Sequence, residues 1–476
     1  MSANNHTPPT PNSNAYVRYH IETDPAPDII PWPSRFNVTV NKIGLAKLLL
    51  TELRHYKGDL DTVLSRPCLY GVFSGPVGGF MPRDQYCVGC LRCTTEHPDF
   101  VTVTPNPERA TLGDNYFNTT HVNAITYEAE HGRIPVRGAG YRGRFAGHGW
   151  DSMWTDMSEI VRPTRDGIHG REFISTVVDI GAKPPFLFFN PDGSLDQTHT
   201  PDTFTIPLPI IFDMPPPNPN VPLLPTIYSR TATNVQTLAI LPLGTILDNH
   251  LHGPHLVPHL TPDNSHQLGL LHDTPKLVEL NSWDPNLYAT VQQQLPHTHI
   301  ALRLPFSDLK TIATAYGAGI RIFHLTANYH GQAADGTFVL DLIRQAHNHF
   351  VNNGTRDEVT LLGSGGIIAA EHVPKAIIAG LDAVIINTPL LVALQTRFKG
   401  QYKSPTDPCT IPHNLNIPWG VQRLQNVMAT WRDQLLEIMG AMGLREVRRL
   451  RGEMGRAMFH KDLEREAFAG IEGYNE

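Results

Sequence analysis

The second half of the chain alternates short apolar runs with stretches of helical length. Continuous apolar runs are typical of strands that are buried on both faces of a parallel sheet. The alternation predicts an α/β fold, either a (β/α)8 TIM-type barrel or a doubly wound sheet. The number of runs favours the barrel, with one strand unplaced. Seven runs can be counted, at residues 209–212, 238–241, 277–280, 300–302, 320–325, 359–362 and 383–386.

Shifts in composition divide the chain into five parts. The start is rich in Asn and Pro, a helical pattern and a group of cysteines follow, and a stretch rich in Gly, Arg and Asp leads into the alternating region. We therefore expect a disordered tail at 1–35, a helical and cysteine-bearing segment at 36–110, an irregular connector at 111–204, the barrel core at 205–405 and a C-terminal helical region at 406–476.

Charge and hydropathy exclude several classes of partner. The formal net charge is −7 and the pI is about 6.4, which argues against nucleic acid as the main partner. No apolar run approaches the roughly 18 residues of a membrane-spanning helix. The start lacks the basic and then apolar order of a signal peptide. These features predict a cytoplasmic protein with no membrane and no nucleic-acid partner.

Three cysteines lie close together in the N-terminal half. Cys87, Cys90 and Cys93 have the C-x2-C-x2-C spacing of bacterial-type ferredoxins, and Gly89 gives the backbone room to wrap around a cluster. Where such a run has its last cysteine, this sequence has His97 instead. In ferredoxins that cysteine serves a second cluster, so the sequence predicts a single iron–sulfur cluster.

The fourth ligand of that cluster is left open by the spacing. A 4Fe-4S cluster needs a fourth thiolate, for which Cys68 is the nearest candidate and Cys409 the other. A 3Fe-4S cluster needs neither. A zinc knuckle and three free thiols are the alternatives. Disulfides are not expected, because the cysteines are clustered and odd in number.

A glycine-rich turn follows the buried run at 359–362. Gly363, Ser364, Gly365 and Gly366 precede a stretch of helical pattern. Glycines at the end of a strand let backbone N–H groups approach a phosphate, and late barrel strands are the usual phosphate site. The alternative is a tight turn that binds nothing.

Several blocks of the chain resemble the glutamate synthase family, in its archaeal-type, stand-alone form without the glutaminase domain. The resemblance implies an FMN-binding barrel and an oxidoreductase that makes glutamate from ammonia and 2-oxoglutarate. It also implies an electron-donor subunit or ferredoxin as partner, with ammonia from solution or from a glutaminase subunit. The blocks are residues 138–147, 151–181, 356–367, 371–382 and 444–452.

The same resemblance assigns roles to individual residues. Arg303 stands where related synthases carry a lysine that faces the flavin, although a surface arginine at a strand end is the alternative. Independently of the resemblance, His324 and His330 flank the end of the run at 320–325, which is the functional end of a barrel strand, and this position predicts an acid–base or substrate role. The predicted FMN-phosphate residues are Gly363, Ser364, Gly365, Gly366, Asn387 and Thr388.

Three departures from the family pattern support a rival interpretation. The region 394–409 holds a single cysteine where related synthases carry a cysteine run. The loop after the first strand is a proline run at 215–217, and the Asn387-Thr388 loop lacks the usual glycine. The alternative function is therefore a degenerate, inactive barrel that serves as an electron-transfer or scaffold subunit.

A histidine-rich stretch precedes the third strand-length run. His250, His252, His255 and His259 lie close enough in sequence to bind zinc, but their spacing matches no common zinc motif. We interpret the stretch as a solvated loop.

Overall fold

The structure is a computed structural model, and it describes residues 19–64, 68–74, 78–134, 149–155, 174–184, 186–196, 200–217 and 221–471. Residues 1–18 of the predicted tail and the block at 138–147 lie outside the described residues, as does much of the block at 151–181.

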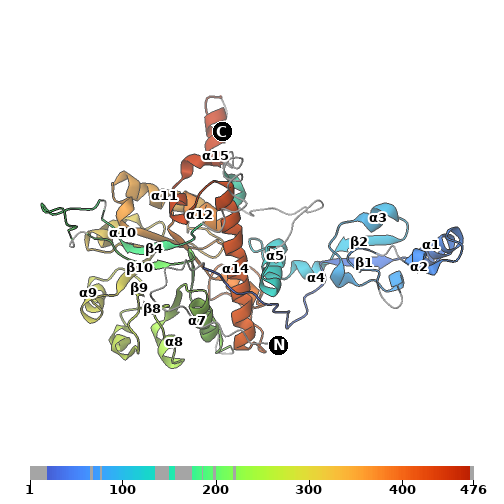
Figure 1. The fold of residues 1–476 in the computed structure, drawn as a ribbon, viewed down its shortest axis with the longest axis horizontal. Helices are drawn as coiled ribbons and strands as arrows, with labels where there is room; N and C mark the ends of the chain where they lie inside the picture. The colour runs from blue at the N-terminus through green and yellow to red at the C-terminus, as the bar shows by residue number, and fades with distance from the viewer. Residues whose placement is uncertain are drawn as a thin grey trace.

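Eight parallel strands close into a barrel, which confirms the predicted (β/α)8 fold (Figure 1). Buried apolar side chains fill its interior, as the continuous apolar runs require. Going around the barrel, β13 pairs with β6 and β9 pairs with β10, so the sheet has no free edge. The strands are β6 Ile210–Phe212, β7 Ala239–Pro242, β8 Leu256–Leu260, β9 Leu277–Leu280, β10 His299–Pro305, β11 Ile322–Thr326, β12 Thr360–Ser364 and β13 Ala383–Ile386.

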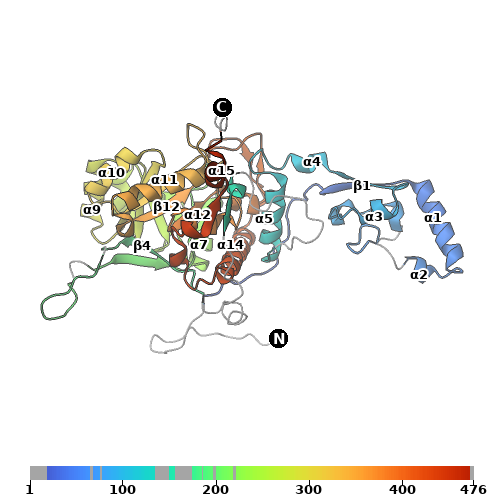
Figure 2. The same cartoon turned by 90° about the horizontal axis from the view of Figure 1, so that it is seen from above.

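Helices follow the strands and form the outer ring (Figures 1 and 2). In α11, apolar residues recur every three to four positions and are buried against the sheet, while the opposite face is polar. The outer elements are α7 Leu224–Asn234, α8 Leu243–Asp248, the 3-10 helix η6 Ser265–Leu270, α9 Pro285–Gln294, α10 Leu309–Gly317, α11 Val339–Asn352, α12 His372–Ala379 and α13 Thr388–Ala393.

The strand that the sequence left unplaced is β8. Pro258 and His259 interrupt its apolar run, and Pro258 lies opposite Leu241 of β7. The interpretation of a solvated loop is wrong for His259, whose side chain points into the barrel and is 14% exposed. It is also wrong for His255, which is largely buried against α7, where it bonds to Ser229.

An antiparallel hairpin lies at the N-terminal end of the barrel strands. It consists of β4 Val178–Ala182 and β5 Asp202–Ile206. The hydroxyl of Thr360, at the start of β12, donates to the carbonyl of Gly181 and accepts from its amide. The loop beyond the hairpin projects from the barrel and carries exposed apolar side chains at Phe186, Leu187, Phe188 and Phe189 (Figure 2).

The C-terminal region is dominated by the long helix α14, Ile417–Ala441, which packs against α7 and against α5, Thr119–His131. Residues 19–35, which were expected in the tail, lie along these helices. Arg423 of α14 donates to the carbonyl of Ala26 and pairs with Asp28, and Gln395 accepts from the amides of Ile29 and Ile30. Buried polar side chains therefore hold this proline-rich segment without regular structure of its own.

The cysteines lie in a small lobe, residues 36–105, that stands apart from the barrel in both views (Figures 1 and 2). It has its own core of Val38, Val72, Cys87 and Val101. Its first and last strands pair antiparallel, so the chain enters and leaves side by side. The elements are β1 Phe36–Val40, α1 Lys42–His55, α2 Leu60–Leu64, η1 Gly78–Phe80, η2 Asp84–Tyr86, α3 Arg92–Glu96 and β2 Val101–Pro105.

None of the helices in the described ranges is long and apolar enough to cross a membrane.

The remaining elements of the structure are short. These elements are α4 Pro107–Ala110, η3 Trp150–Ser152, β3 Met153–Thr155, η7 Arg356–Glu358, β14 Arg397–Phe398, β15 Cys409–Thr410, η8 Val447–Leu450, η9 Met454–Arg456, β16 Ala457–Phe459 and α15 His460–Phe468.

A histidine near the N-terminal end of β12 makes the stability of the fold depend on pH. His347 of α11 accepts a hydrogen bond from Arg356 at Nδ1, 3.1 Å away. Burial, reinforced by the charge of Arg356, lowers the pKa of His347 to about 4. In the unfolded chain this imidazole titrates near pH 6.5, so the stability it contributes is lost as the pH falls from about 6.5 towards 4.

We expect the free energy of unfolding to fall by about 1 kcal/mol between pH 7 and pH 5 through His347. His347→Asn keeps an acceptor for Arg356 but cannot titrate. Urea unfolding at both pH values should show a smaller loss in this variant than in the wild type. An equal loss in both proteins would contradict the assignment.

Candidate functional site

Polar side chains from five strands meet inside the barrel at the C-terminal ends of the strands. The register places Arg303 of β10 beside His324 of β11, and Glu279 of β9 beside His259 of β8. Asp213 follows the last residue of β6, and its amide bonds to β13. In a parallel barrel these ends share one rim, which is where active sites lie on this fold.

Glu279 is the centre of this group. It accepts hydrogen bonds from His324 Nδ1 at 2.5 Å, from His259 Nδ1 at 2.8 Å and from Arg303 at 3.3 Å. Arg303 also binds Asp213 through both terminal nitrogens, at 2.8 and 3.1 Å. The second ring nitrogen of His324 lies 2.8 Å from the hydroxyl of Ser364. A continuous hydrogen-bonded chain therefore runs from Asp213 to the glycine turn after β12.

The charges in this chain stabilise one another. Burial alone would raise the pKa of Glu279, but His324 and Arg303 hold it well below its usual value. Asp213 is shifted in the same direction, because the charge of Arg303 and its hydrogen bonds outweigh burial. Burial would lower the pKa of Arg303, yet the two carboxylates raise it. Both acids are therefore ionised and Arg303 is cationic.

Both predicted catalytic residues, Arg303 and His324, belong to this group. The side chain of Arg303 is 22% exposed and that of His324 is fully buried. Sequence reasoning missed Asp213, Glu279 and His259. Two features of the sequence could have indicated the two acids. Glu279 is a lone acidic residue inside the apolar run at 277–280, and Asp213 directly follows the run at 209–212.

The second histidine of this region has a different partner. His330 donates to Asp114, 2.6 Å away, and the amide of Tyr402 donates to the same carboxylate. The segment around Asp114 thus closes over one side of the barrel rim. Cys409, a candidate cluster ligand, lies here as well, on β15 beside Tyr402. It is on the barrel and not in the cysteine lobe.

The glycine turn after β12 is tightly packed. Gly365 and Gly366 have positive φ values of +99° and +71°. A Cβ atom at Gly365 would lie 2.6 Å from the carbonyl oxygen of Ala327, and one at Gly366 would lie 2.6 Å from the Cα of Gly331. Packing alone therefore requires both glycines. An aspartate at 366 would disturb the backbone whether or not a phosphate binds.

The amides of this turn give an independent indication of an anion. No described residue accepts a hydrogen bond from the backbone amide of Gly366 or Ile367, although both residues are buried. The amide of Ile368, in contrast, donates to His372. Buried backbone donors are nearly always paired, so an acceptor from outside the chain fits this turn.

The neighbouring strand end carries the other two predicted phosphate residues. Asn387 caps α13 by accepting from the amide of Thr388 at 2.5 Å and from its hydroxyl at 2.9 Å. Both side chains are buried. Gly363 and Ser364 lie on β12, and Gly363 contacts Leu381 and Phe306 rather than the rim. Of the six predicted phosphate residues, Gly366 is the best placed to donate, because both donors of Thr388 already bind Asn387.

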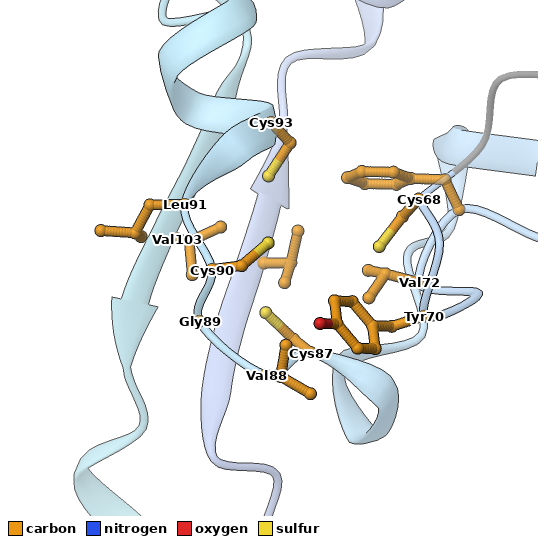
Figure 3. A pocket seen from close by; sticks show the side chains of 12 residues that line it. Cys68, Tyr70, Val72, Cys87, Val88, Gly89, Cys90, Leu91, Cys93 and Val103 are labelled. Atoms are coloured by element: carbon orange, nitrogen blue, oxygen red, sulfur yellow. The ribbon is translucent and has the colours of Figure 1, made fainter. Parts of the chain in front are cut away.

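The four cysteines of the lobe line one cavity (Figure 3). Cys87 ends η2, Cys90 follows the left-handed Gly89, Cys93 lies on α3, and Cys68 approaches from the preceding loop. Their sulfurs point into the same space. Cys68 therefore joins the three motif cysteines, whereas Cys409 does not.

The sulfurs are spread more widely than the ligands of a single zinc ion. A tetrahedral zinc ion with bonds of about 2.3 Å places its thiolates roughly 3.8 Å apart. Within the described residues, the one group of three metal-ligand side chains with all ligand atoms within 4.8 Å of one another contains no cysteine. A cuboidal cluster binds each thiolate through a separate iron and so needs wider spacing. Burial raises the pKa of the Cys87 and Cys93 thiols.

Comparison with known proteins shows that the chain is similar to glutamate synthases. Residues 328–445 match a family model described as "Conserved region in glutamate synthase". The archaeal-type glutamate synthase [NADPH] of Dehalococcoides mccartyi is 21% identical over 446 residues, which cover 78% of this chain and 86% of that protein. The chain is therefore similar to archaeal-type glutamate synthases over most of its length. The matched region of the family model includes the glycine turn, Asn387 and Thr388, while Arg303, His324 and the cysteine lobe precede it.

Shorter alignments of this glutamate synthase-like chain have higher identity. The archaeal glutamate synthase [NADPH] of Methanocaldococcus jannaschii is 33% identical over 110 residues, and that of Archaeoglobus fulgidus is 32% identical over 136 residues. These segments span 22% and 26% of the length of each relative, and the same shares of this chain. Among solved structures, mandelate oxidase aligns with 63% of this chain at 13% identity, with a TM-score of 0.37.

Glu279 offers a direct test of the barrel network. Glu279→Gln removes the buried negative charge that accepts hydrogen bonds from His259, Arg303 and His324. We therefore expect the free energy of unfolding to fall by about 3 kcal/mol. Glu358→Gln is the matched control, because its partly exposed carboxylate binds Tyr316 and Arg321. Urea unfolding should show a loss below about 1 kcal/mol for the control. Equal losses would mean that Glu279 is not the centre of the network.

Proposed function

We propose that the chain is an FMN-dependent, iron–sulfur-containing oxidoreductase of the glutamate synthase type. The observation that carries this proposal is the pair of buried amides at Gly366 and Ile367, which have no acceptor among the described residues. They lie at the end of a late barrel strand, inside the region that matches the glutamate synthase family model. A phosphate supplies the acceptor that these donors lack.

FMN would be held at two places. The amides of Gly366 and Ile367 would bind its phosphate, and the hydroxyl of Thr388 would join them by turning away from Asn387. The charged rim around Arg303 would face its ring. FMN supplies hydride and electron transfer when bound. The protein supplies position and charge: Asp213 and Glu279 fix the guanidinium of Arg303, which can bind a substrate carboxylate or stabilise negative charge.

His324 is the proposed proton carrier of the site. It lies between Glu279, which accepts from Nδ1, and Ser364, whose hydroxyl meets Nε2. Reduction of an imino acid to an amino acid consumes a proton, and a histidine bonded on both sides can hold one at either nitrogen. The reaction we propose is the reductive amination of 2-oxoglutarate or a related amino-group reaction.

Electrons would enter through the cysteine lobe. We propose a 4Fe-4S cluster on Cys68, Cys87, Cys90 and Cys93, because four thiols and not three line the cavity. The lobe stands apart from the barrel rim, so an electron-donor subunit or ferredoxin must approach it. A glutaminase subunit is the proposed partner if ammonia is not taken from solution. Thiolate ligands of this kind favour a reducing, cytoplasmic location.

A degenerate barrel is the second candidate function, and specific observations favour it. Packing alone explains Gly365 and Gly366, and the terminal nitrogens of Arg303 already bind Asp213 and Glu279. The loop after β6 contains three prolines at 215–217, which offer no backbone donors. In this alternative the chain carries the cluster and serves as an electron-transfer or scaffold subunit without flavin.

The cluster ligands can be tested with matched cysteine variants. Cys68→Ser should lower the iron content of anaerobically purified protein from about four to at most three atoms per chain, with the spectrum of a three-iron cluster or none. Cys409→Ser should leave iron and spectrum unchanged, because this thiol lies on the barrel. Full iron content in Cys68→Ser would remove Cys68 from the ligand set. Zinc in place of iron would overturn the cluster.

The phosphate site can be tested with matched threonine variants. Thr388→Val removes one proposed donor, and we expect FMN binding to weaken about tenfold, or about 1.4 kcal/mol. Thr396→Val is the control, because its buried hydroxyl has no hydrogen-bond partner among the described residues. Fluorescence titration of flavin-free protein measures both. Unchanged affinity in Thr388→Val would remove this hydroxyl from the site, and absence of FMN binding by the wild type would support the degenerate barrel.

A further inference from the structure

A group of metal-ligand side chains lies at the opposite end of the barrel from the proposed flavin. His252 belongs to the loop between α8 and β8, and His272 and Asp273 belong to the loop between η6 and β9. Both loops lead into the N-terminal ends of neighbouring strands. The group is therefore separate from the charged rim around Glu279 and from the cysteine lobe.

The three side chains converge on one point. A nitrogen from each imidazole and an oxygen of the carboxylate all lie within 4.8 Å of one another, and the two ring centroids are 4.7 Å apart. A tetrahedral zinc ion with bonds of about 2.0 Å places its ligands roughly 3.3 Å apart. Closing the group around an ion therefore needs movements of about 1.5 Å at most, which exposed side chains can make.

The carboxylate is held in place by its surroundings. Asp273 accepts from the amide of Gly253 at one oxygen, 2.8 Å away, and from His272 Nδ1 at the other, 3.0 Å away. The hydrogen bond from Gly253 orients the carboxylate before an ion arrives. The hydrogen bond between His272 and Asp273 joins two of the proposed ligands, and an ion would take its place.

Packing does not account for the two histidines. The side chain of His272 is 74% exposed, and His252 is exposed beside it. His272 and Asp273 are neighbours in one loop, and His252 approaches them from the other loop, with its ring edge to face against that of His272. Imidazole and carboxylate are ligands that zinc accepts, and a water from the solvent side completes the four ligands of a tetrahedral ion.

We propose that His252, His272 and Asp273 bind a zinc ion, which ties the α8–β8 loop to the η6–β9 loop. The ion connects two successive units of the barrel at the end remote from the rim, and its role is structural. Because it binds the folded chain and not the unfolded one, it raises the stability of this part of the barrel. Calcium and magnesium prefer oxygen ligands and do not fit this set.

The test uses the full chain with its cysteine site intact and anaerobic, titrated with Co2+ as a spectroscopic substitute and then with Zn2+. We expect one Co2+ per chain with weak visible bands and no thiolate charge-transfer band, displaced by one equivalent of Zn2+. His252→Ala and His272→Ala should each weaken binding at least tenfold and abolish the rise in melting temperature that Zn2+ gives the wild type.

His297→Ala and His413→Ala are the controls, since both histidines are exposed and lie outside the group. Equal binding in all four variants would overturn the proposal, because it would show that the ion binds elsewhere. A thiolate band that disappears in Cys90→Ser would assign the metal to the cysteine lobe and would overturn it as well. Unchanged melting temperature with one bound Zn2+ would overturn the structural role.

Discussion

The buried carboxylate of Glu279 is the interaction on which the barrel rim depends. It joins side chains from three neighbouring strands and holds Arg303, which in turn holds Asp213. A buried charge costs several kcal/mol unless its partners are present, so none of these residues can be lost alone without penalty. The same contacts carry the hydrogen-bonded chain to Ser364 and thus connect the rim to the glycine turn.

The structure separates the cysteine lobe from the charged barrel rim in space. The cysteine lobe has its own small core and joins the rest of the chain through a pair of antiparallel strands. The cluster that related synthases hold beside the flavin has no counterpart at 394–409, where Cys409 faces Tyr402. Under the proposed function, electrons therefore reach the barrel only when another protein or a second lobe comes close.

The sequence predicted the barrel because seven of its eight strands are continuous apolar runs, which a parallel sheet requires. It missed β8, since Pro258 and His259 break the apolar pattern. The cysteine motif follows from spacing, but the choice between Cys68 and Cys409 depends on tertiary folding. Asp213, Glu279 and Asp114 were missed because each acts through partners far away in sequence, such as the pairing of Asp114 with His330. The sequence predicted Gly365 and Gly366 as phosphate-binding residues, but close packing also requires glycine at both positions.

One measurement tests the central claim most directly: protein, flavin and iron quantified together on a single anaerobic preparation of the wild-type chain. The account predicts about one FMN and about four irons per chain, with the flavin reduced when electrons are supplied to the cluster by a ferredoxin or reductase. Iron without any flavin, even after incubation with FMN, would contradict the synthase assignment and leave the barrel as a scaffold.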